Sequence, residues 1–266
     1  MSEVQVNRSD SVKQSTGKRI GMLLVPDTGL DSEIWEWCPQ AVTPLITRLQ
    51  IPDTGHDEYD SVDQVIGSRK VVQSATRSFL SSRMLHGTDP DIVVLNCTSA
   101  SFSYGLEGER SIRQSILDAG ARRALTASGA VIGALTALEA KKIAVGTPYD
   151  TRTNDALKKF LTEAGFEVAS IPTTEIDDLD NTSDDQIRAI ADAAYDKHAT
   201  AMFISCAGLR TRHLLPALNA KYKLPVLTSL QATMWAALVQ IDERVTGPAN
   251  VLYSLQWPEA VPLLPV

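Results

Sequence analysis

The sequence predicts an α/β fold of two similar lobes, each a mostly parallel open sheet flanked by helices. Three observations lead to this prediction. Apolar strand segments alternate with helical segments of roughly 10 to 15 residues, which is the pattern of β-α-β units. The second half of the chain repeats the order of segments found in the first half. The length of 266 residues suffices for two domains, each with a core of its own.

The first half contains two apolar runs that are typical of buried strands, each ending in a polar turn. A helix between them is expected to end before Gly87 and Pro90, because neither residue continues a helix well. A further helix has an apolar face and is expected to stop at Gly120. The expected elements are, in chain order, a strand at 19–26, a helix within 61–85, a strand at 91–97 and a helix at 108–120.

The second half continues the alternation with four more strands and four more helices. Asp150 and Ser183 are expected to cap the helices that they precede, since both side chains can accept a hydrogen bond from the first turn. Pro216 is expected to interrupt its helix. The expected elements are strands at 141–149, 166–172, 200–206 and 225–229, and helices at 150–165, 183–197, 211–223 and 230–241.

Three pairs of segments indicate an internal duplication. "RIGMLLVPDTG" resembles "KIAVGTPYDT", "IVVLNCTSA" resembles "AMFISCAGL", and "TASGAVIGALTAL" resembles "TSLQATMWAALVQ". The prediction is therefore two lobes related by pseudo-twofold symmetry, with the active site between them. The expected boundaries are a flexible N-terminal tail at 1–18, a first lobe at 19–125 plus 230–258, and a second lobe at 126–229.

Composition excludes several classes of function. The net charge of −7 argues against a nucleic-acid binder, which carries a basic surface. No apolar run reaches the roughly 18 residues of a membrane helix, and the polar N-terminus lacks the apolar core of a signal peptide. Three cysteines, an odd number, do not suggest a disulfide framework, which favours the cytoplasm. The four histidines lack metal-ligand spacing, so no metal site is expected.

Two cysteines stand where a sheet of this kind binds its ligands. Cys97 and Cys206 each follow a predicted strand, and ligands of open α/β sheets bind beyond the carboxyl ends of the strands. If the lobes face each other, both sulfurs reach one cleft from opposite sides. Small residues follow each cysteine and let backbone N–H groups point inward to hold a carboxylate. They are Thr98 and Ser99 after the first cysteine, and Ala207 and Gly208 after the second.

An alternative interpretation is that these thiols are merely small apolar side chains, as most buried cysteines are. The matching positions of Cys97 and Cys206 in the repeat favour a functional role for both. Cys38 has no counterpart in the repeat, and the structural interpretation is preferred there.

The motifs "NCTSASFSYG", "GTPYDTRTND", "SCAGLRT" and "PVLTSLQATMW" resemble those of the aspartate/glutamate racemase superfamily. The likeness lies in the branch of maleate cis-trans isomerase and arylmalonate decarboxylase, and ectoine-utilisation proteins are also similar. It runs from about Arg19 to Gln240. The resemblance implies two α/β lobes, chemistry at their interface, and no metal or organic cofactor.

The resemblance also implies roles for particular residues. Cys97 matches a position that is cysteine in isomerases and racemases but glycine in arylmalonate decarboxylases, and Cys206 matches a cysteine present in both. Thr98 and Ser99 match donors to a carboxylate or an oxyanion. Tyr149 matches a tyrosine that contacts a substrate carboxylate. Asn154 matches an asparagine in the helix that follows it.

Two further residues are candidates for binding a carboxylate. Thr28 is the neutral donor in the turn "VPDTGLDSE", where Asp27 stands instead of the asparagines of maleate isomerases, so maleate itself is a doubtful substrate. Arg210, at the start of a helical segment, is a possible partner of a carboxylate. Residues 27–60 are expected to form the variable loops that shape the substrate pocket.

Three functions remain open on these observations. The first is a cofactor-independent isomerase or racemase that acts on a small carboxylate, with Cys97 as thiolate and Cys206 as proton donor. The second is a decarboxylase that uses Cys206 alone as its proton donor. The third is a non-catalytic, two-lobed ligand-binding protein. A homo-oligomer, either a dimer or a tetramer, is expected.

Overall fold

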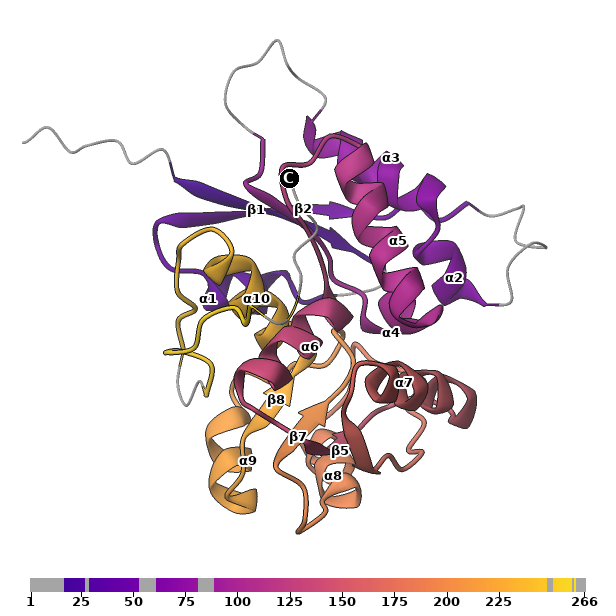
Figure 1. Ribbon diagram of the computed structural model, residues 1–266, viewed down its shortest axis with the longest axis vertical. Helices are drawn as coiled ribbons and strands as arrows, with labels where there is room; N and C mark the ends of the chain where they lie inside the picture. Colours follow the sequence, from indigo (N-terminus) through magenta and orange to yellow (C-terminus); the bar gives the residue numbers. More distant parts are fainter. Residues whose placement is uncertain are drawn as a thin grey trace, which may run out of the picture.

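Two four-stranded parallel sheets, one in each half of the chain, form the framework of the protein (Figure 1). The computed structural model describes residues 17–26, 29–52, 61–80, 89–247, 251–259 and 261. The first sheet has the order β2-β1-β3-β4 and the second the order β6-β5-β7-β8. The two sheets therefore share one topology, and the predicted α/β class with two similar lobes is confirmed.

Six of the eight described strands overlap the ranges that the apolar runs of the sequence predict, and β2 and β4 lie outside those ranges. The strands of the first sheet are β1 (Lys18–Leu24), β2 (Val42–Arg48), β3 (Ile92–Leu95) and β4 (Ala124–Thr126). Those of the second sheet are β5 (Lys142–Gly146), β6 (Glu167–Ser170), β7 (Ala201–Ile204) and β8 (Val226–Thr228). β1, β3, β5 and β7 are buried over most of their length, as strands covered on both faces must be.

Helices cover both sheets, and two of them begin directly after the predicted capping residues Asp150 and Ser183. They are α1 (Asp31–Trp37), α2 (Val62–Ile66), α3 (Arg69–Leu80), α4 (Thr98–Phe102), α5 (Gly105–Asp118), α6 (Ala127–Ala137), α7 (Thr151–Glu163), α8 (Asp184–Ala194), α9 (Leu215–Tyr222) and α10 (Ser229–Val239). The Asp150 carboxylate accepts a hydrogen bond from the Thr153 N–H at 2.7 Å, and Ser183 forms a capping box with Gln186.

Three expectations from the sequence were wrong. Residues 27–60 are not merely loops, because they contain α1 and β2. β2 was missed because Pro44 argues against a strand, yet β2 lies at the edge of its sheet, where a proline is tolerated. The helix expected within 61–85 is two helices that separate at Gly67, and residues 81–85 lie outside the described ones. Pro216 does not interrupt α9 but stands in its first turn, where no N–H is needed.

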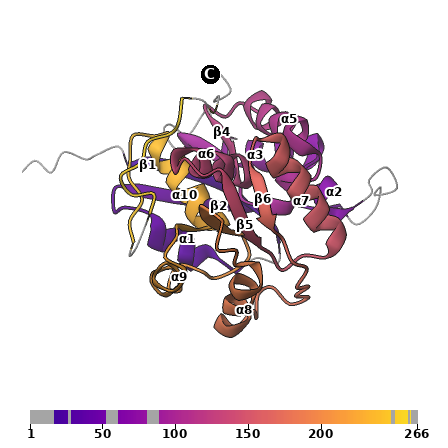
Figure 2. The same cartoon turned by 60° about the horizontal axis from the view of Figure 1, so that its bottom comes forward.

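α6 and α10 lie side by side between the two sheets (Figures 1 and 2). Each follows the last strand of a sheet, β4 or β8, so the pair repeats the duplication at the centre of the molecule. α10 is buried from Ser229 to Leu238. In the part of the chain that the structure describes, no helix is long and apolar enough to span a membrane.

We propose that the lobes divide as the sequence predicts, at 19–125 with 230–258 and at 126–229. Packing of α10 against α1 and β3 supports the return of the chain to the first lobe. Of the segment expected as a tail, residues 1–16 lie outside the described residues, and β1 already begins at Lys18.

Candidate active site

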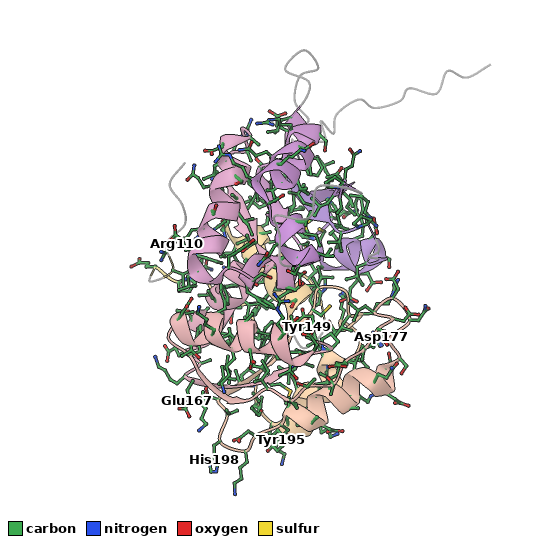
Figure 3. The ribbon with its side chains drawn as sticks, turned by 90° about the vertical axis from the view of Figure 1, so that its right-hand side faces the viewer. Arg110, Tyr149, Glu167, Asp177, Tyr195 and His198 are labelled. Atoms are coloured by element: carbon green, nitrogen blue, oxygen red, sulfur yellow. The ribbon has the colours of Figure 1, made fainter. Side chains whose placement is uncertain are left out.

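Cys97 and Cys206 line one cavity of about 360 Å³, although they come from different sheets. Cys97 follows β3 and directly precedes α4, and Cys206 follows β7. Both side chains are 8% exposed. Tyr149, which follows β5, reaches the same cavity, and Figure 3 shows it at the level where the two halves meet. The cavity thus opens at the carboxyl ends of central strands of both sheets, the usual ligand position in open α/β sheets.

Most of the residues proposed from the sequence gather in this cavity. Besides the cysteines and Tyr149, the predicted residues that line it are Thr98, Ser99, Ala207 and Gly208. Asn96 and Asp63 also line it and were not foreseen. Asn96 had a signal in the sequence, because it is the polar residue that ends the apolar run before Cys97.

The Cys97 thiol sits in surroundings that keep it protonated. The Ser99 hydroxyl donates a hydrogen bond to Asp63 Oδ1 at 2.6 Å, and Ser99 Oγ lies 3.7 Å from Cys97 Sγ. A serine has one hydroxyl proton, so Ser99 is the acceptor and Cys97 the donor in their contact. Burial raises the pKa of Cys97 to about 12, and the Asp63 carboxylate adds to the rise. Hydrogen bonds from the Ala100 N–H and with Ser99 oppose this rise in the pKa of Cys97.

Cys206 has more hydrogen-bond donors than Cys97. The Gly208 N–H donates to Cys206 Sγ at 3.3 Å, and the Tyr149 hydroxyl also donates to this sulfur. The Ser205 hydroxyl in turn donates to Tyr149 Oη at 3.4 Å. Burial raises the pKa of Cys206 to about 11, while these donors lower it. These donors favour the thiolate form of Cys206, so we propose Cys206 as the thiolate in place of Cys97.

The backbone at Cys206 is strained. Its φ of 98° lies in the left-handed region, which residues with a side chain rarely adopt. Strain of this kind costs on the order of 1–3 kcal/mol and gathers at functional sites. Here it aims the sulfur into the cavity next to Tyr149 and Gly208.

Two buried polar side chains of the cavity have no hydrogen-bond partner among the described residues. They are the Asn96 amide, 1% exposed, and the Thr98 hydroxyl, 2% exposed. Leaving a buried polar group unpaired costs about 1–3 kcal/mol, so such groups are rare unless they serve a function. Asn96 and Thr98 are therefore donors suited to hold a ligand oxygen.

Two predicted residues, Asn154 and Arg210, are not among the described residues that line the cavity, and a third lies outside the described residues. Asn154 is buried and accepts a hydrogen bond from the Thr147 hydroxyl at 2.6 Å, so it fixes the turn that carries Tyr149. The exposed Arg210 donates to the Gly29 carbonyl at 2.5 Å, a contact between the two halves of the chain. Thr28 lies outside the described residues.

Glu33 on α1 anchors the loop that follows Cys206. Its buried carboxylate accepts hydrogen bonds from the N–H groups of Thr211, at 3.2 Å, and Arg212, at 3.1 Å. Burial raises the pKa of Glu33, while the two backbone donors oppose this rise. The sequence does not predict this contact, because Thr211 and Arg212 lie 178 and 179 residues from Glu33 along the chain.

Replacing Glu33 by alanine is expected to lower the free energy of unfolding by about 2 kcal/mol, because two backbone N–H groups lose their acceptor. Glu36→Ala is the matched control on the same helix. The Glu36 side chain is 56% exposed and pairs with Arg212 at 3.2 Å, so its loss is expected to change stability by less than about 1 kcal/mol. Urea unfolding of the two variants measures both values, and equal losses would contradict an anchoring role for Glu33.

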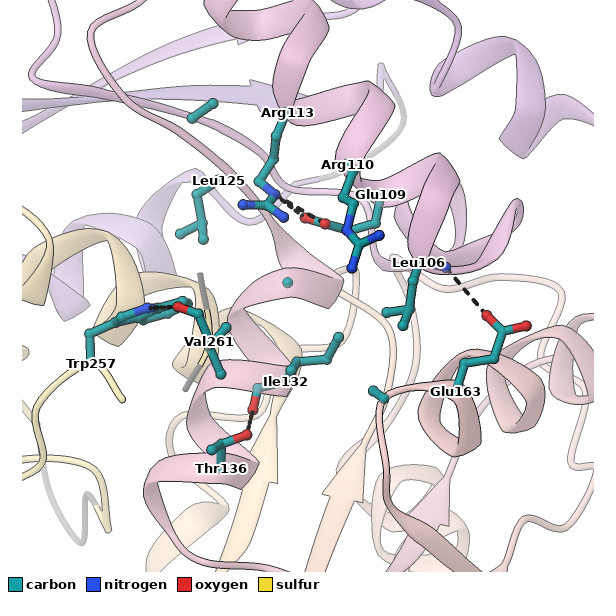
Figure 4. Close-up of a pocket in the computed structure, with 13 residues that line it drawn as sticks. Leu106, Glu109, Arg110, Arg113, Leu125, Ile132, Thr136, Glu163, Trp257 and Val261 are labelled. Atoms are coloured by element: carbon teal, nitrogen blue, oxygen red, sulfur yellow. Dashed lines mark hydrogen bonds and ion pairs between the residues drawn. The ribbon is translucent and has the colours of Figure 1, made fainter. Parts of the chain in front are cut away.

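A second cavity of about 350 Å³ lies between α5, α6, α7 and the segment after α10 (Figure 4). Its charged groups largely satisfy one another, with Arg113 bonded to Glu109 at 2.8 Å. The Thr136 hydroxyl donates to the Ile132 carbonyl at 2.8 Å. No cysteine is among its described lining residues. No group of three or more potential metal ligands occurs in the described ranges of the chain. The cysteine cavity is therefore the candidate active site.

Comparison with known proteins shows which family the chain resembles. The family model described as arylmalonate decarboxylase matches residues 56–252. The chain is 26% identical over 241 residues to the arylmalonate decarboxylase of Bordetella bronchiseptica, covering 85% of this chain and 92% of that protein. It is 26% identical over 174 residues to a maleate isomerase of Pseudomonas putida, covering 62% and 70%.

Crystal structures of related proteins have the same fold. A variant of the maleate isomerase from Pseudomonas putida S16 with maleate matches with a TM-score of 0.71 and 19% identity, over 90% of this chain and 98% of that one. A variant of the Nocardia farcinica maleate cis-trans isomerase with a covalently bound succinylcysteine intermediate matches with a TM-score of 0.72 and 17% identity, over 88% and 96%. Since the family model spans most of the sequence, this chain belongs to the arylmalonate decarboxylase family.

Proposed function

We propose that this protein is a cofactor-independent isomerase or racemase that acts on a small carboxylate through Cys97 and Cys206. The observation that carries the proposal is that two thiols from different sheets line one cavity. An enzyme that works on both faces of a small planar substrate needs one acid–base group on each side. The unpaired donors of Asn96 and Thr98 beside Cys97 support binding of a carboxylate there.

The proposed roles of the two sulfurs follow from their hydrogen bonds. Cys206 acts as the thiolate, because Tyr149 and Gly208 donate to its sulfur. Cys97 acts as the acid, since its thiol is the donor toward Ser99. In stereo-inversion, the Cys206 thiolate takes a proton from one face of the substrate carbon and the Cys97 thiol returns one to the other face. The negative charge then moves from one sulfur to the other.

Cis-trans isomerisation would use Cys206 as the nucleophile and Cys97 as the acid that supplies a proton to the enediolate carbon and removes it again. The Cys206 thiolate adds to one alkene carbon, and the electron pair passes into the adjacent carboxylate as an enediolate. Rotation about the new single bond and expulsion of the thiolate complete the change. In a variant of the Nocardia farcinica isomerase with one cysteine replaced by serine, a succinylcysteine forms on a remaining cysteine. This supports a cysteine adduct and does not favour Cys206 over Cys97 as the nucleophile.

A decarboxylase is the second candidate, and the description of the matching family favours it. It would need only Cys206, which protonates the carbanion left after carbon dioxide departs. The Cys97 thiol counts against this candidate, because a leaving carboxylate is destabilised best by apolar surroundings.

A substrate screen in deuterated water tests the proposal. Wild-type enzyme, Cys97→Ser and Cys206→Ser are incubated under reducing conditions with maleate, aspartate, glutamate and an arylmalonate, and the products are followed by NMR. Isomerisation, or deuterium gained at the reacting carbon without release of carbon dioxide, supports the proposal if both variants lose it. Release of carbon dioxide that only Cys206→Ser abolishes establishes the decarboxylase. Full turnover in both variants excludes thiol chemistry. We also propose a homo-oligomer, a dimer or tetramer, which sedimentation velocity measures.

A further inference from the structure

The cysteine cavity has a negatively charged wall. Asp63, half-buried on α2, lines it together with both cysteines. Among the described residues its carboxylate accepts one hydrogen bond, from the Ser99 hydroxyl to Oδ1 at 2.6 Å. Asp180 also lines the cavity, and its Oδ1 accepts a hydrogen bond from the Gly29 N–H at 3.1 Å. Asp63 borders the cavity, and its Oδ2 has no protein donor in the described ranges.

Asp63 has no cationic partner among the described residues. Among the described residues that line the cavity, none is lysine, arginine or histidine. Arg152 lines a separate small cavity of about 150 Å³ that Asp63 borders as well. Within the described residues no ion pair joins Arg152 to Asp63, and the carboxyl whose pKa Arg152 lowers is that of Asp150. Burial and the charge of Asp150 raise the pKa of Asp63, as expected for a carboxylate without a cationic partner.

We propose that Asp63 selects substrates that carry a protonated nitrogen, so that the protein acts on small zwitterions with a carboxylate and an ammonium or amidinium group, and not on dicarboxylates. This inference rests on the proposed function of the cavity. The neutral donors of Asn96 and Thr98 hold the substrate carboxylate, and Asp63 Oδ2 accepts a hydrogen bond from the cationic nitrogen. A dicarboxylate would bring two more negative charges into a small cavity that already holds the Asp63 carboxylate, and like charges in such a site repel strongly.

Charge pairing at Asp63 would also activate the thiols. The Asp63 carboxylate raises the pKa of both Cys97 and Cys206 through its charge. A bound ammonium neutralises that charge, so both pKa values fall when the correct substrate enters. The thiolate therefore forms in the complex more readily than in the free enzyme, where it would be open to oxidation.

A different role for Asp63 has to be separated from this one. Ser99 lies between Asp63 and Cys97, so Asp63 could take the Cys97 proton through the Ser99 hydroxyl. In that relay the S–H bond breaks, Ser99 gains the thiol proton, and the original Ser99 proton passes to Asp63. If Asp63 acts in a relay, turnover of every substrate depends on it. If Asp63 selects by charge, its loss strengthens the binding of dicarboxylates.

Binding of matched ligands tests the inference independently of turnover. Wild-type protein, Asp63→Asn, Asp63→Glu and Asp180→Asn are titrated by calorimetry with three pairs: alanine and lactate, aspartate and malate, and β-alanine and malonate. Wild type is expected to bind the amine-bearing member of at least one pair roughly tenfold more tightly than its partner. Asp63→Asn is expected to lower the affinity for that ligand roughly tenfold and to bind malonate or malate more tightly than wild type does. Asp63→Glu is expected to keep the wild-type preference.

Asp180→Asn serves as the matched control within the same cavity. The exposed Asp180 side chain is held by the Gly29 N–H, so its loss is expected to change affinity less than threefold, about the size of a weak surface effect. Asparagine at position 63 can still accept the Ser99 hydrogen bond, and an unchanged melting temperature verifies its fold. The inference is overturned if wild type prefers no amine-bearing ligand, or if Asp63→Asn weakens both members of a pair equally. Failure of the proposed function would appear elsewhere, as full turnover in the cysteine variants.

Discussion

Cys97→Ser and Cys206→Ser are each expected to lower kcat by a factor of about 10³ or more. A serine hydroxyl is far less acidic than a thiol and is a weak nucleophile without an adjacent base, and no histidine lines the cavity among the described residues. Because both sulfurs act on one substrate, the double variant should be no slower than either single variant. NMR in deuterated water, with the substrate found in the screen, measures these rates.

Two variants control for folding. Cys38→Ser should keep activity within about threefold of wild type, since Cys38 follows α1 and does not line the cavity. Cys206→Gly should be at least as stable as wild type, because glycine adopts a φ of 98° without strain, yet it should be inactive. Cys97→Gly should retain at most a decarboxylation that depends on Cys206. A Cys97→Ser enzyme with near wild-type turnover would contradict the two-thiol proposal and favour the decarboxylase.

Tyr149→Phe is expected to lower kcat/KM by roughly 10- to 100-fold and to move its pH profile to higher pH. The Tyr149 hydroxyl donates to Cys206, and burial raises the pKa of Tyr149 well above its usual value, so the hydroxyl remains a donor. Loss of this donor raises the pKa of Cys206 further above about 11. At any pH below that pKa, the thiolate fraction falls about tenfold for each unit of increase. Activity that depends on the thiolate is then regained only at higher pH.

Ser205→Ala is the graded control for this prediction. Ser205 donates to Tyr149 and not to the sulfur, so its loss should shift the profile in the same direction by a smaller amount. A Tyr149→Phe enzyme with an unchanged pH profile and a raised KM would show instead that the hydroxyl contacts the substrate carboxylate, as the family resemblance implies.

The sequence predicts the elements whose signals are local. Period and capping residues placed nearly all strands and helices, and Asp150 and Ser183 cap as expected. The repeat placed Cys97 and Cys206 at equivalent strand ends, because residues that follow central strands of duplicated sheets have equivalent positions. β2 was not recognised, since whether a proline is tolerated depends on whether the strand lies at the sheet edge.

Contacts between segments that lie far apart in the chain could not be predicted from the sequence. Asp63 meets Ser99 across 36 residues, and Glu33 meets Thr211 across 178. The Ser99 hydroxyl donates to the Asp63 carboxylate, a contact that the proposed roles of the two thiols depend on and that the sequence does not predict. The helix expected within 61–85 gave no reason to place its first turn at the active site.

Protection of the thiols by substrate tests the central claim, that one substrate lies between Cys97 and Cys206. The protein is treated with iodoacetamide at pH 9 with and without saturating substrate, and each cysteine is followed by peptide mass spectrometry. The prediction is that substrate slows alkylation of Cys97 and Cys206 to the same degree and leaves Cys38, outside the cavity, unaffected. Protection of Cys206 alone, with Cys97 alkylated at its unprotected rate, would contradict the account.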